Sequence, residues 1–334
     1  MSRRGWVAAG IATAAVATLL PSALKQAKAL RAVDPGLRGP LTWVRLPVPL
    51  MAKLTKSGLV TRARGLAEGI ENQARTVPGA EGRPDVRLEL YRRPGLPGSV
   101  PALLWIHGGG YVMGAVTNDD YWCCRVAGEL DVVVVSTDYR KAPEHPFPAG
   151  LDDCFASLTW LIEHAEELGV DPGRIIIGGN SAGGGLAAAL AQRAYDAGIE
   201  LRSQLLVYPM LDDRTVPRAE AQKEWTVVWS PRNNRFGWTS YLNAEPGVGA
   251  PPAYAVPARR DDLSGLPPAW IGVGSVDLFH DEDVEYARRL NAAGVECVLY
   301  VSPGMPHGMH IGSDAPIAEA FNRASLNALA AALW

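Results

Sequence analysis

Residues 174–187 read RIIIGGNSAGGGLA, a β-branched run that passes through glycines around Ser181 into an alanine-rich stretch. A buried parallel strand favours continuous Ile and Val, and the composition from Leu186 onward is helix-forming, so the stretch predicts strand, sharp turn and helix. Gly179 and Gly183 complete the pattern G-x-S-x-G, in which a strained turn and a close strand–helix approach require glycine. The pattern predicts a nucleophile elbow, although by itself it is equally compatible with a loop that only packs or binds phosphate.

The composition is that of an ordinary globular protein, with 48% hydrophobic and 20% charged residues among 334. The net charge of −3 provides no basic field, so we expect no nucleic-acid partner. This length is compatible with one large α/β core that carries an insertion. The cysteines form no CxxC pair and have no zinc-like histidine spacing, so we expect no metal site and reduced, mostly buried thiols at Cys123, Cys124, Cys154 and Cys297.

Apolar runs of strand length alternate with helical patterns along most of the chain. Strands are expected at 86–91, 102–106, 132–137, 174–178, 204–208, 269–273 and 295–301, and helices at 151–168, after Ser181, near 281–293 and near 315–333. This alternation predicts an α/β fold with a mostly parallel sheet and helices on both faces. Ligands bind outside the carboxyl ends of such strands, which is where Ser181 lies.

Residues 213–250 interrupt this alternation and are rich in Trp, Asn and Pro. We interpret them as a cap insertion over the top of the sheet, joined by an N-terminal cap region at residues 33–84. Residues 85–334 are then the catalytic domain that contains this insertion.

Residues 1–32 form a separate apolar segment, in which Arg3 and Arg4 precede a nearly uncharged run at residues 5–24. Three interpretations remain open. The run is an export signal, with a small-residue cleavage pattern at 27–29; or a membrane anchor, weakened by Pro21; or a helix of the cap. Membrane association or export is favoured over a cytoplasmic location, because a helix that is apolar all round has no solvent face.

A serine hydroxyl is a poor nucleophile at neutral pH, so Ser181 needs a general base within hydrogen-bond reach. His307 lies in the Gly/Pro-rich stretch SPGMPHGMH after the strand at 295–301, at the edge of the sheet where such a base is expected. His310 follows three residues later and is a competitor for the role. We predict His307 as the base.

The base in turn needs a carboxylate that holds its tautomer and stabilises the imidazolium. Asp277 follows directly after a predicted strand, whereas Asp281 and Asp283 fall in the next helix, where first-turn carboxylates favour the helix dipole. The chain order Ser181, Asp277, His307 is that of an α/β-hydrolase and differs from both main serine protease orders.

Attack on a carbonyl group creates an oxyanion, which needs preorganised backbone donors. Residues 107–114, HGGGYVMG, form such a glycine loop directly after a strand, and His107 is expected to brace it. The predicted oxyanion hole consists of Gly108, Gly109, Gly110 and Ala182. The chain has no GxxxxGK[ST] motif and no convincing dinucleotide fingerprint, so we expect no cofactor.

Taken together, these motifs resemble the hormone-sensitive lipase group of α/β-hydrolases, the bacterial family IV carboxylesterases. The resemblance rests on HGGGYVMG, DYRKAPEHPFPAG at 138–150, GNSAGGGLA, YPMLD at 208–212 and the segments of Asp277 and His307, in family order over residues 85–334. It implies an eight-stranded sheet, a helical cap built partly from the N-terminal region, and a Ser-His-Asp triad. It also implies hydrolysis of short to medium acyl esters through an acyl-enzyme, without a cofactor.

Two further points concern individual residues. Within 138–150 the resemblance implies that Arg140, Glu144 and His145 form a scaffold under the site. Asn180 departs from the family, which usually has Asp or Thr before the nucleophile, and so removes a charge beside the elbow.

The expected substrate is a small-molecule ester in a pocket of limited depth, walled by Tyr111, Trp225, Trp229 and Trp238, although the tryptophans are equally compatible with a cap core. Two other functions share the fold: a non-catalytic small-molecule binding protein, against which His307 argues, and an amidase or peptidase. The sequence also leaves a homodimer open.

Overall fold

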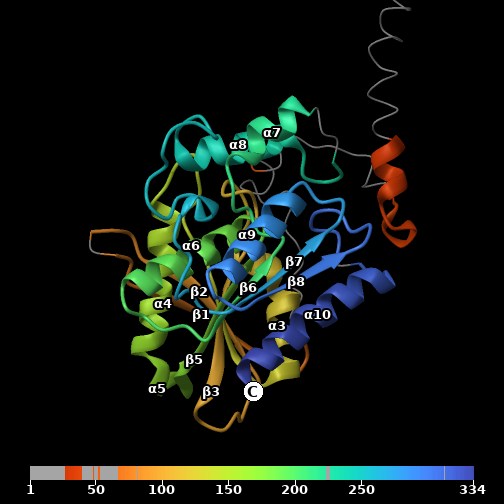
Figure 1. Ribbon diagram of the computed structural model, residues 1–334. Coiled ribbons are helices and arrows are strands. Elements are labelled where there is room, and N and C mark those ends of the chain that lie inside the picture. The colour runs from red at the N-terminus through yellow and green to blue at the C-terminus, as the bar shows by residue number, and fades with distance from the viewer. Residues whose placement is uncertain are drawn as a thin grey trace, which may run out of the picture.

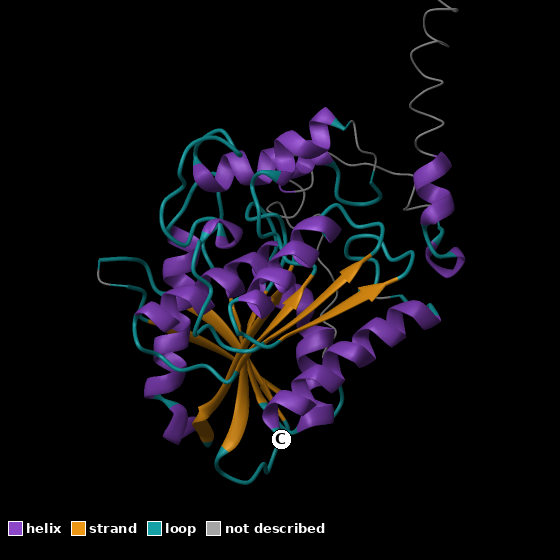
Figure 2. Cartoon of the chain, in the orientation of Figure 1, coloured by secondary structure: helices purple, strands orange, loops and turns teal. Residues whose placement is uncertain are grey.

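The computed structural model describes residues 27–39, 48, 52, 67–80, 82–222, 226–311 and 313–334. Within these residues eight strands form one sheet in the order β1-β2-β4-β3-β5-β6-β7-β8 (Figures 1 and 2). The strands are β1 (Glu71–Val77), β2 (Val86–Arg92), β3 (Val100–Ile106), β4 (Val133–Thr137), β5 (Val170–Asn180), β6 (Ser203–Val207), β7 (Ala269–Gly274) and β8 (Cys297–Ser302).

The sheet is mostly parallel. Strand β2 is antiparallel to both β1 and β4, whereas β4, β3, β5, β6, β7 and β8 pair with one another in parallel. The carboxyl ends of these parallel strands therefore meet at one edge, as the α/β prediction requires. The predicted fold class and the eight strands that the resemblance implied are confirmed.

Helices cover both faces of the sheet, and those of residues 213–250 lie above it. The helices are α3 (Asp120–Leu130), α4 (Ala149–Glu163), α5 (Ala165–Leu168), α6 (Ala182–Asp196), α7 (Thr215–Ala221), α8 (Pro231–Leu242), α9 (His280–Ala292) and α10 (Pro316–Leu333). Side chains of β3 alternate between two buried clusters: Leu104 and Ile106 face one, Leu103 and Trp105 the other. The first cluster contains residues of α4, α6 and α9, and the second contains residues of α3 and α10.

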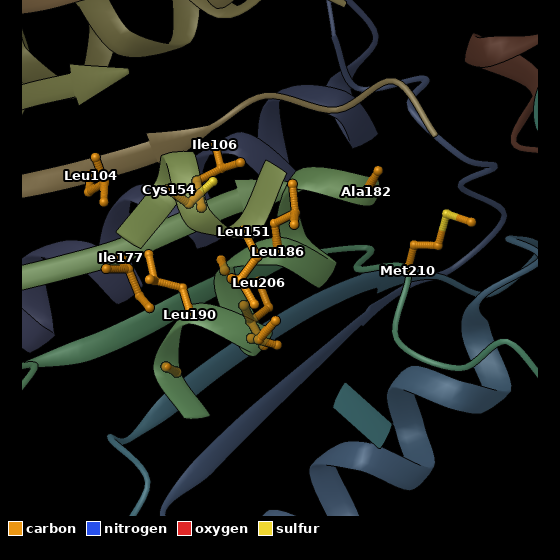
Figure 3. Close-up of a cluster of buried hydrophobic side chains, with 14 of the residues drawn as sticks. Leu104, Ile106, Leu151, Cys154, Ile177, Ala182, Leu186, Leu190, Leu206 and Met210 are labelled. Atoms are coloured by element: carbon orange, nitrogen blue, oxygen red, sulfur yellow. The ribbon is translucent and has the colours of Figure 1, made fainter. Parts of the chain in front are cut away.

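The first cluster fixes the helix that follows Ser181. Side chains from β3, β5, α4 and α6 gather there, with Leu186 and Leu190 of α6 among them (Figure 3). Every alanine of α6 is buried, and these small side chains allow the helix to lie close to the strands. Burying one leucine contributes about 1.5–3 kcal/mol, so the cluster holds both ends of the turn at Ser181.

Two elements are absent from the sequence-based prediction. Strand β1, with the sequence ENQARTV, is an edge strand with mostly exposed side chains, so it lacks the apolar alternation of a half-buried strand. Residues 33–84 were expected to be cap, but β1 belongs to the sheet, because its backbone pairs with β2 from Glu71 to Val77. Helix α3 is the second unpredicted element.

The insertion at residues 213–250 lies above the sheet, where α7 and α8 form the upper layer in Figure 1. The amide of Val48 donates to Asn233 Oδ1 of α8 over 3.4 Å, so one residue of the N-terminal region contacts this layer. The apolar run at residues 5–24 lies outside the described residues. Among the described residues, no helix combines the length and apolarity needed to cross a bilayer.

We expect Gly183→Ala to destabilise the fold, because the added Cβ would lie 2.0 Å from the carbonyl oxygen of Ile106 in β3. Overpacking usually costs about 1–3 kcal/mol, and a clash with strand backbone should lower the free energy of unfolding by the upper value or more. Urea unfolding followed by circular dichroism measures the loss. Gly98→Ala is the control, because no atom lies within 4 Å of its added Cβ. Equal stability of both variants would contradict the close approach.

Candidate active site

Ser181 lies between β5 and α6 in a strained backbone conformation, with φ 54° and ψ −121°. Its amide donates to the carbonyl of Val207 over 2.9 Å, and its carbonyl accepts from the amide of Met210 over 2.9 Å. A Cβ on Gly179 would lie 2.5 Å from the carbonyl of Gly183, so the turn closes only with glycine there. The serine therefore stands on a sharp turn that the neighbouring strand end holds in place.

The structure brings Ser181, His307 and Asp277 into one hydrogen-bonded chain. His307 Nε2 lies 2.9 Å from Ser181 Oγ, and His307 Nδ1 lies 2.8 Å from Asp277 Oδ2. The other carboxylate oxygen of Asp277 accepts from the amide of Phe279 over 3.0 Å. All three side chains are more than nine-tenths buried. This arrangement allows the imidazole to take a proton from the hydroxyl while the carboxylate fixes its tautomer.

The residues that could compete with His307 and Asp277 for their roles lie elsewhere. His310 is buried against Tyr208 and Phe321, with ring centroids 5.2 and 5.0 Å away, and it does not line the cavity at Ser181. Asp281 is exposed at the start of α9. Asp283, in the same turn, is fully buried, and this burial raises the pKa of its carboxyl well above the usual range. No hydrogen-bond donor in the described part of the chain reaches its oxygens.

The glycine loop follows β3 and passes beside the serine. Gly109 and Gly110 adopt φ values of 134° and 60°, which favour glycine. Within the described residues no protein acceptor takes a hydrogen bond from either amide. Ala182 begins α6, so its amide has no partner inside the helix. These donors are available to an anionic oxygen beside Ser181 Oγ.

His107 has the contacts expected of a residue that stabilises the glycine loop. Its ring is fully buried, its Nδ1 lies 2.7 Å from the carbonyl oxygen of Gly108, and its Nε2 lies 3.8 Å from Asp138. The hydroxyl of Tyr139 donates to the His107 carbonyl over 3.1 Å. A Cβ on Gly114 would lie 2.6 Å from the His107 ring, so both ends of the glycine loop close on this side chain.

The scaffold expected in residues 138–150 is organised differently from the prediction. Arg140 forms a two-pronged ion pair with the buried carboxylate of Asp153 in α4. Glu144 and His145 have exposed side chains. The charge pair therefore joins Arg140 to the first turns of α4, which begins at Ala149 within this segment.

A cavity of about 290 Å³ opens beside Ser181 and His307. Of the predicted wall residues, Trp229 lines it and packs on the glycine loop, where a Cβ on Gly110 would lie 2.3 Å from its ring. Tyr111 and Trp238 are instead buried in the core and do not line the cavity: the hydroxyl of Tyr111 donates to the Met210 carbonyl over 2.9 Å. Trp225 lies outside the described residues.

Glu282 is a supporting residue that the sequence reasoning missed. It is buried in α9, and its carboxyl accepts from the amides of Leu211 and Asp212 over 2.7 and 3.2 Å and from the hydroxyl of Thr215. Burial raises the pKa of Glu282 well above its usual range. The residue joins the helix behind Asp277 to the loop after β6 and to α7. The sequence feature that could have identified Glu282 is its position five residues after Asp277.

Comparison with known proteins agrees with this architecture. Residues 103–311 match a family model described as alpha/beta hydrolase fold. The chain is 38% identical over 243 residues to carboxylesterase NlhH of Mycobacterium tuberculosis, covering 71% of this chain and 74% of the relative. It is 36% identical over 245 residues to ethyl acetate hydrolase of Pseudomonas putida, covering 68% and 72%.

A solved structure of similar shape is that of a bacterial heroin esterase. It superposes with a TM-score of 0.83 at 35% sequence identity, over 91% of this chain and 99% of that one. The match includes the sheet and extends well beyond the motifs quoted above. The chain therefore belongs to the α/β-hydrolase fold family, in which it is an esterase that hydrolyses carboxylic esters.

Proposed function

We propose that the chain hydrolyses small carboxylic esters by a serine mechanism with Ser181 as nucleophile. The observation that carries the proposal is the continuous hydrogen-bonded chain from Ser181 Oγ through His307 to Asp277. His307 Nε2 takes the hydroxyl proton as Oγ attacks the carbonyl carbon, and it returns that proton to the departing alkoxide, which leaves as the alcohol. Water then attacks the acyl-enzyme with His307 again as base, which releases the acid and regenerates the serine.

The tetrahedral intermediate carries a negative oxygen, which we place at the amides of Gly109, Gly110 and Ala182. These amides come from two different elements, the loop after β3 and the first turn of α6. The N-terminus of α6 adds the positive end of its helix dipole at the same point. Each such donor typically contributes about 3 kcal/mol to transition-state stabilisation.

We propose that the acyl group is short to medium in length. The cavity of about 290 Å³ is small for a ligand pocket, and Trp229 limits it on the side of the glycine loop. A rigid aromatic side chain on that side limits the space for a long acyl chain.

The serine mechanism predicts that Ser181→Ala and His307→Ala abolish ester hydrolysis to a similar degree, because residues of a triad act as a unit. We expect kcat to fall by roughly 10⁴-fold or more in each. Nitrophenyl acetate hydrolysis measures the rate, and mass spectrometry after an organophosphate should show one label, on Ser181.

His310→Ala is the matched control, since His310 is a buried histidine three residues away that does not line the cavity. It should retain most of the activity. A larger loss in His310→Ala than in His307→Ala would move the base to His310.

Acyl preference has its own test. Hydrolysis rates of nitrophenyl esters should rise from acetate to butyrate or hexanoate and fall strongly for palmitate, because the cavity cannot hold a long chain. Met113 lines the cavity, so Met113→Ala enlarges the cavity and should shift the preference toward longer acyl groups. A wild-type maximum at palmitate would contradict the proposed size limit.

We further propose that residues 5–24 associate with a membrane or direct export. The support is the sequence alone, an uncharged apolar run behind two arginines. A chain that begins near Val33 should lose membrane association in cell fractionation and keep its activity and acyl preference. Loss of folding or a changed preference would instead assign the run to the cap.

We also propose that two copies of the chain form a homodimer. Strand β8 is the last strand of the sheet order, and Val298 on it is 52% exposed. An open edge strand with an exposed apolar residue offers a surface on which a second copy can pair.

A further inference from the structure

Two buried polar side chains lie directly behind the nucleophile and have no part in the mechanism above. Asn180 is the last residue of β5, and Asp119 ends the 3-10 helix η3 (Val116–Asp119). Both are 6% exposed. Asn180 Nδ2 donates to Asp119 Oδ2 over 3.1 Å, and Trp105 Nε1 donates to the same oxygen over 2.9 Å. Two donors on one oxygen indicate that Asp119 serves as the acceptor of this group.

Asn180 also contacts the glycine loop. A Cβ on Gly108 would lie 2.5 Å from Asn180 Oδ1, 3.0 Å from the Asn180 carbonyl oxygen and 3.3 Å from Ser181 Cβ. Gly108 therefore rests on the Asn180 side chain and on the nucleophile together. A rotation of the Asn180 amide would change the distance between the loop amides and Ser181 Oγ.

Only one of the two positions, 119 or 180, can carry an ionised carboxylate. Position 180 must supply a hydrogen-bond donor, because it faces Asp119 Oδ2 at hydrogen-bond distance. No donor in the described part of the chain reaches Asn180 Oδ1. A second carboxylate at position 180 would meet Asp119 in a buried site, where two carboxyl groups stay together only while they share a proton.

We propose that Asp119 and Asn180 are a positioning pair for ester hydrolysis: Asp119 orients the Asn180 amide, and Asn180 sets the distance between the glycine loop and Ser181. This inference rests on the proposed serine mechanism. Both side chains also border the cavity at Ser181, and the proposal assigns them the positioning of the glycine loop rather than the binding of substrate. The titratable groups around the pair are Asp120 and Cys123 of α3, Tyr91 of β2, Tyr139 after β4, and His307 and His310.

The test is the pH profile of kcat/KM for N180D. While the two carboxyl groups share a proton, the pair keeps its hydrogen bond and the variant should be active. When that proton is lost at higher pH, the carboxylates repel and displace Gly108. We expect kcat/KM of N180D to fall about tenfold or more between about pH 6 and about pH 9, where the parent protein shows no fall.

Exchanging the two side chains between positions 119 and 180 should restore the activity that N180D loses. In the double variant D119N/N180D the donor and the carboxylate exchange places, so one carboxylate and one amide remain. We expect this variant to lose the alkaline fall and to recover activity to within about threefold of the parent protein.

N322D is the matched control. Asn322 of α10 is similarly buried, 9% exposed, and lines a neighbouring cavity rather than the one at Ser181. The same exchange of amide for carboxyl there should leave the alkaline side of the profile unchanged. If the new carboxylate of N180D acted only through its electrostatic effect on His307, the acid side of the pH profile of kcat/KM would shift and no fall would appear at alkaline pH. That result would contradict the positioning role.

Circular dichroism of each variant across the pH range separates positioning from folding. If N180D unfolds at high pH, N180A decides, because it removes the amide without adding charge: a folded N180A with kcat lowered about tenfold and KM unchanged supports positioning. Parental kcat in N180A, an alkaline fall in N322D, or no rescue in the double variant would overturn the proposal. A kcat of S181A within about a hundredfold of the parent protein would instead refute the serine mechanism itself.

Discussion

The close approach of β5 to α6 at Ser181 is the constraint on which the rest of the site depends. The strand and the helix meet so tightly that Gly179 and Gly183 cannot carry a Cβ, and the serine between them takes a backbone conformation that few residues adopt. The buried cluster between α4, α6 and the sheet holds both sides of this turn. Packing energy from apolar side chains therefore maintains the strain at one polar residue.

The parallel sheet places the glycine loop, the acid and the base relative to that turn. Gly108 follows β3, Asp277 follows β7 and His307 follows β8, and each of these strands ends at the same edge. Short connections after parallel strands bring the side chains within hydrogen-bond distance although they are far apart in the chain. The exposed loops can vary while the strand ends keep the geometry constant.

Buried polar residues then connect the layers. Glu282 joins α9 to the loop after β6, Arg140 and Asp153 join a loop to α4, and Asp119 connects η3 to β3 and β5 through Trp105 and Asn180. The first contact holds the helix that follows Asp277, and the third holds the end of the strand that precedes Ser181. Removing one partner would leave a buried polar group without its hydrogen bond, which costs more than the bond itself contributes.

The sequence by itself determined the fold class, the turn at Ser181 and the chain order of the three residues now seen in hydrogen-bond contact. These follow from local patterns: continuous β-branched runs, glycine spacing and polar residues directly after strands. The tertiary structure decided what local patterns cannot encode. It placed the polar edge strand β1 in the sheet, put Trp238 and Tyr111 in the core rather than on the cavity wall, and paired Arg140 with Asp153 and Asn180 with Asp119. Such contacts join residues distant in the chain, and their geometry depends on how whole elements pack, which no short window of sequence contains.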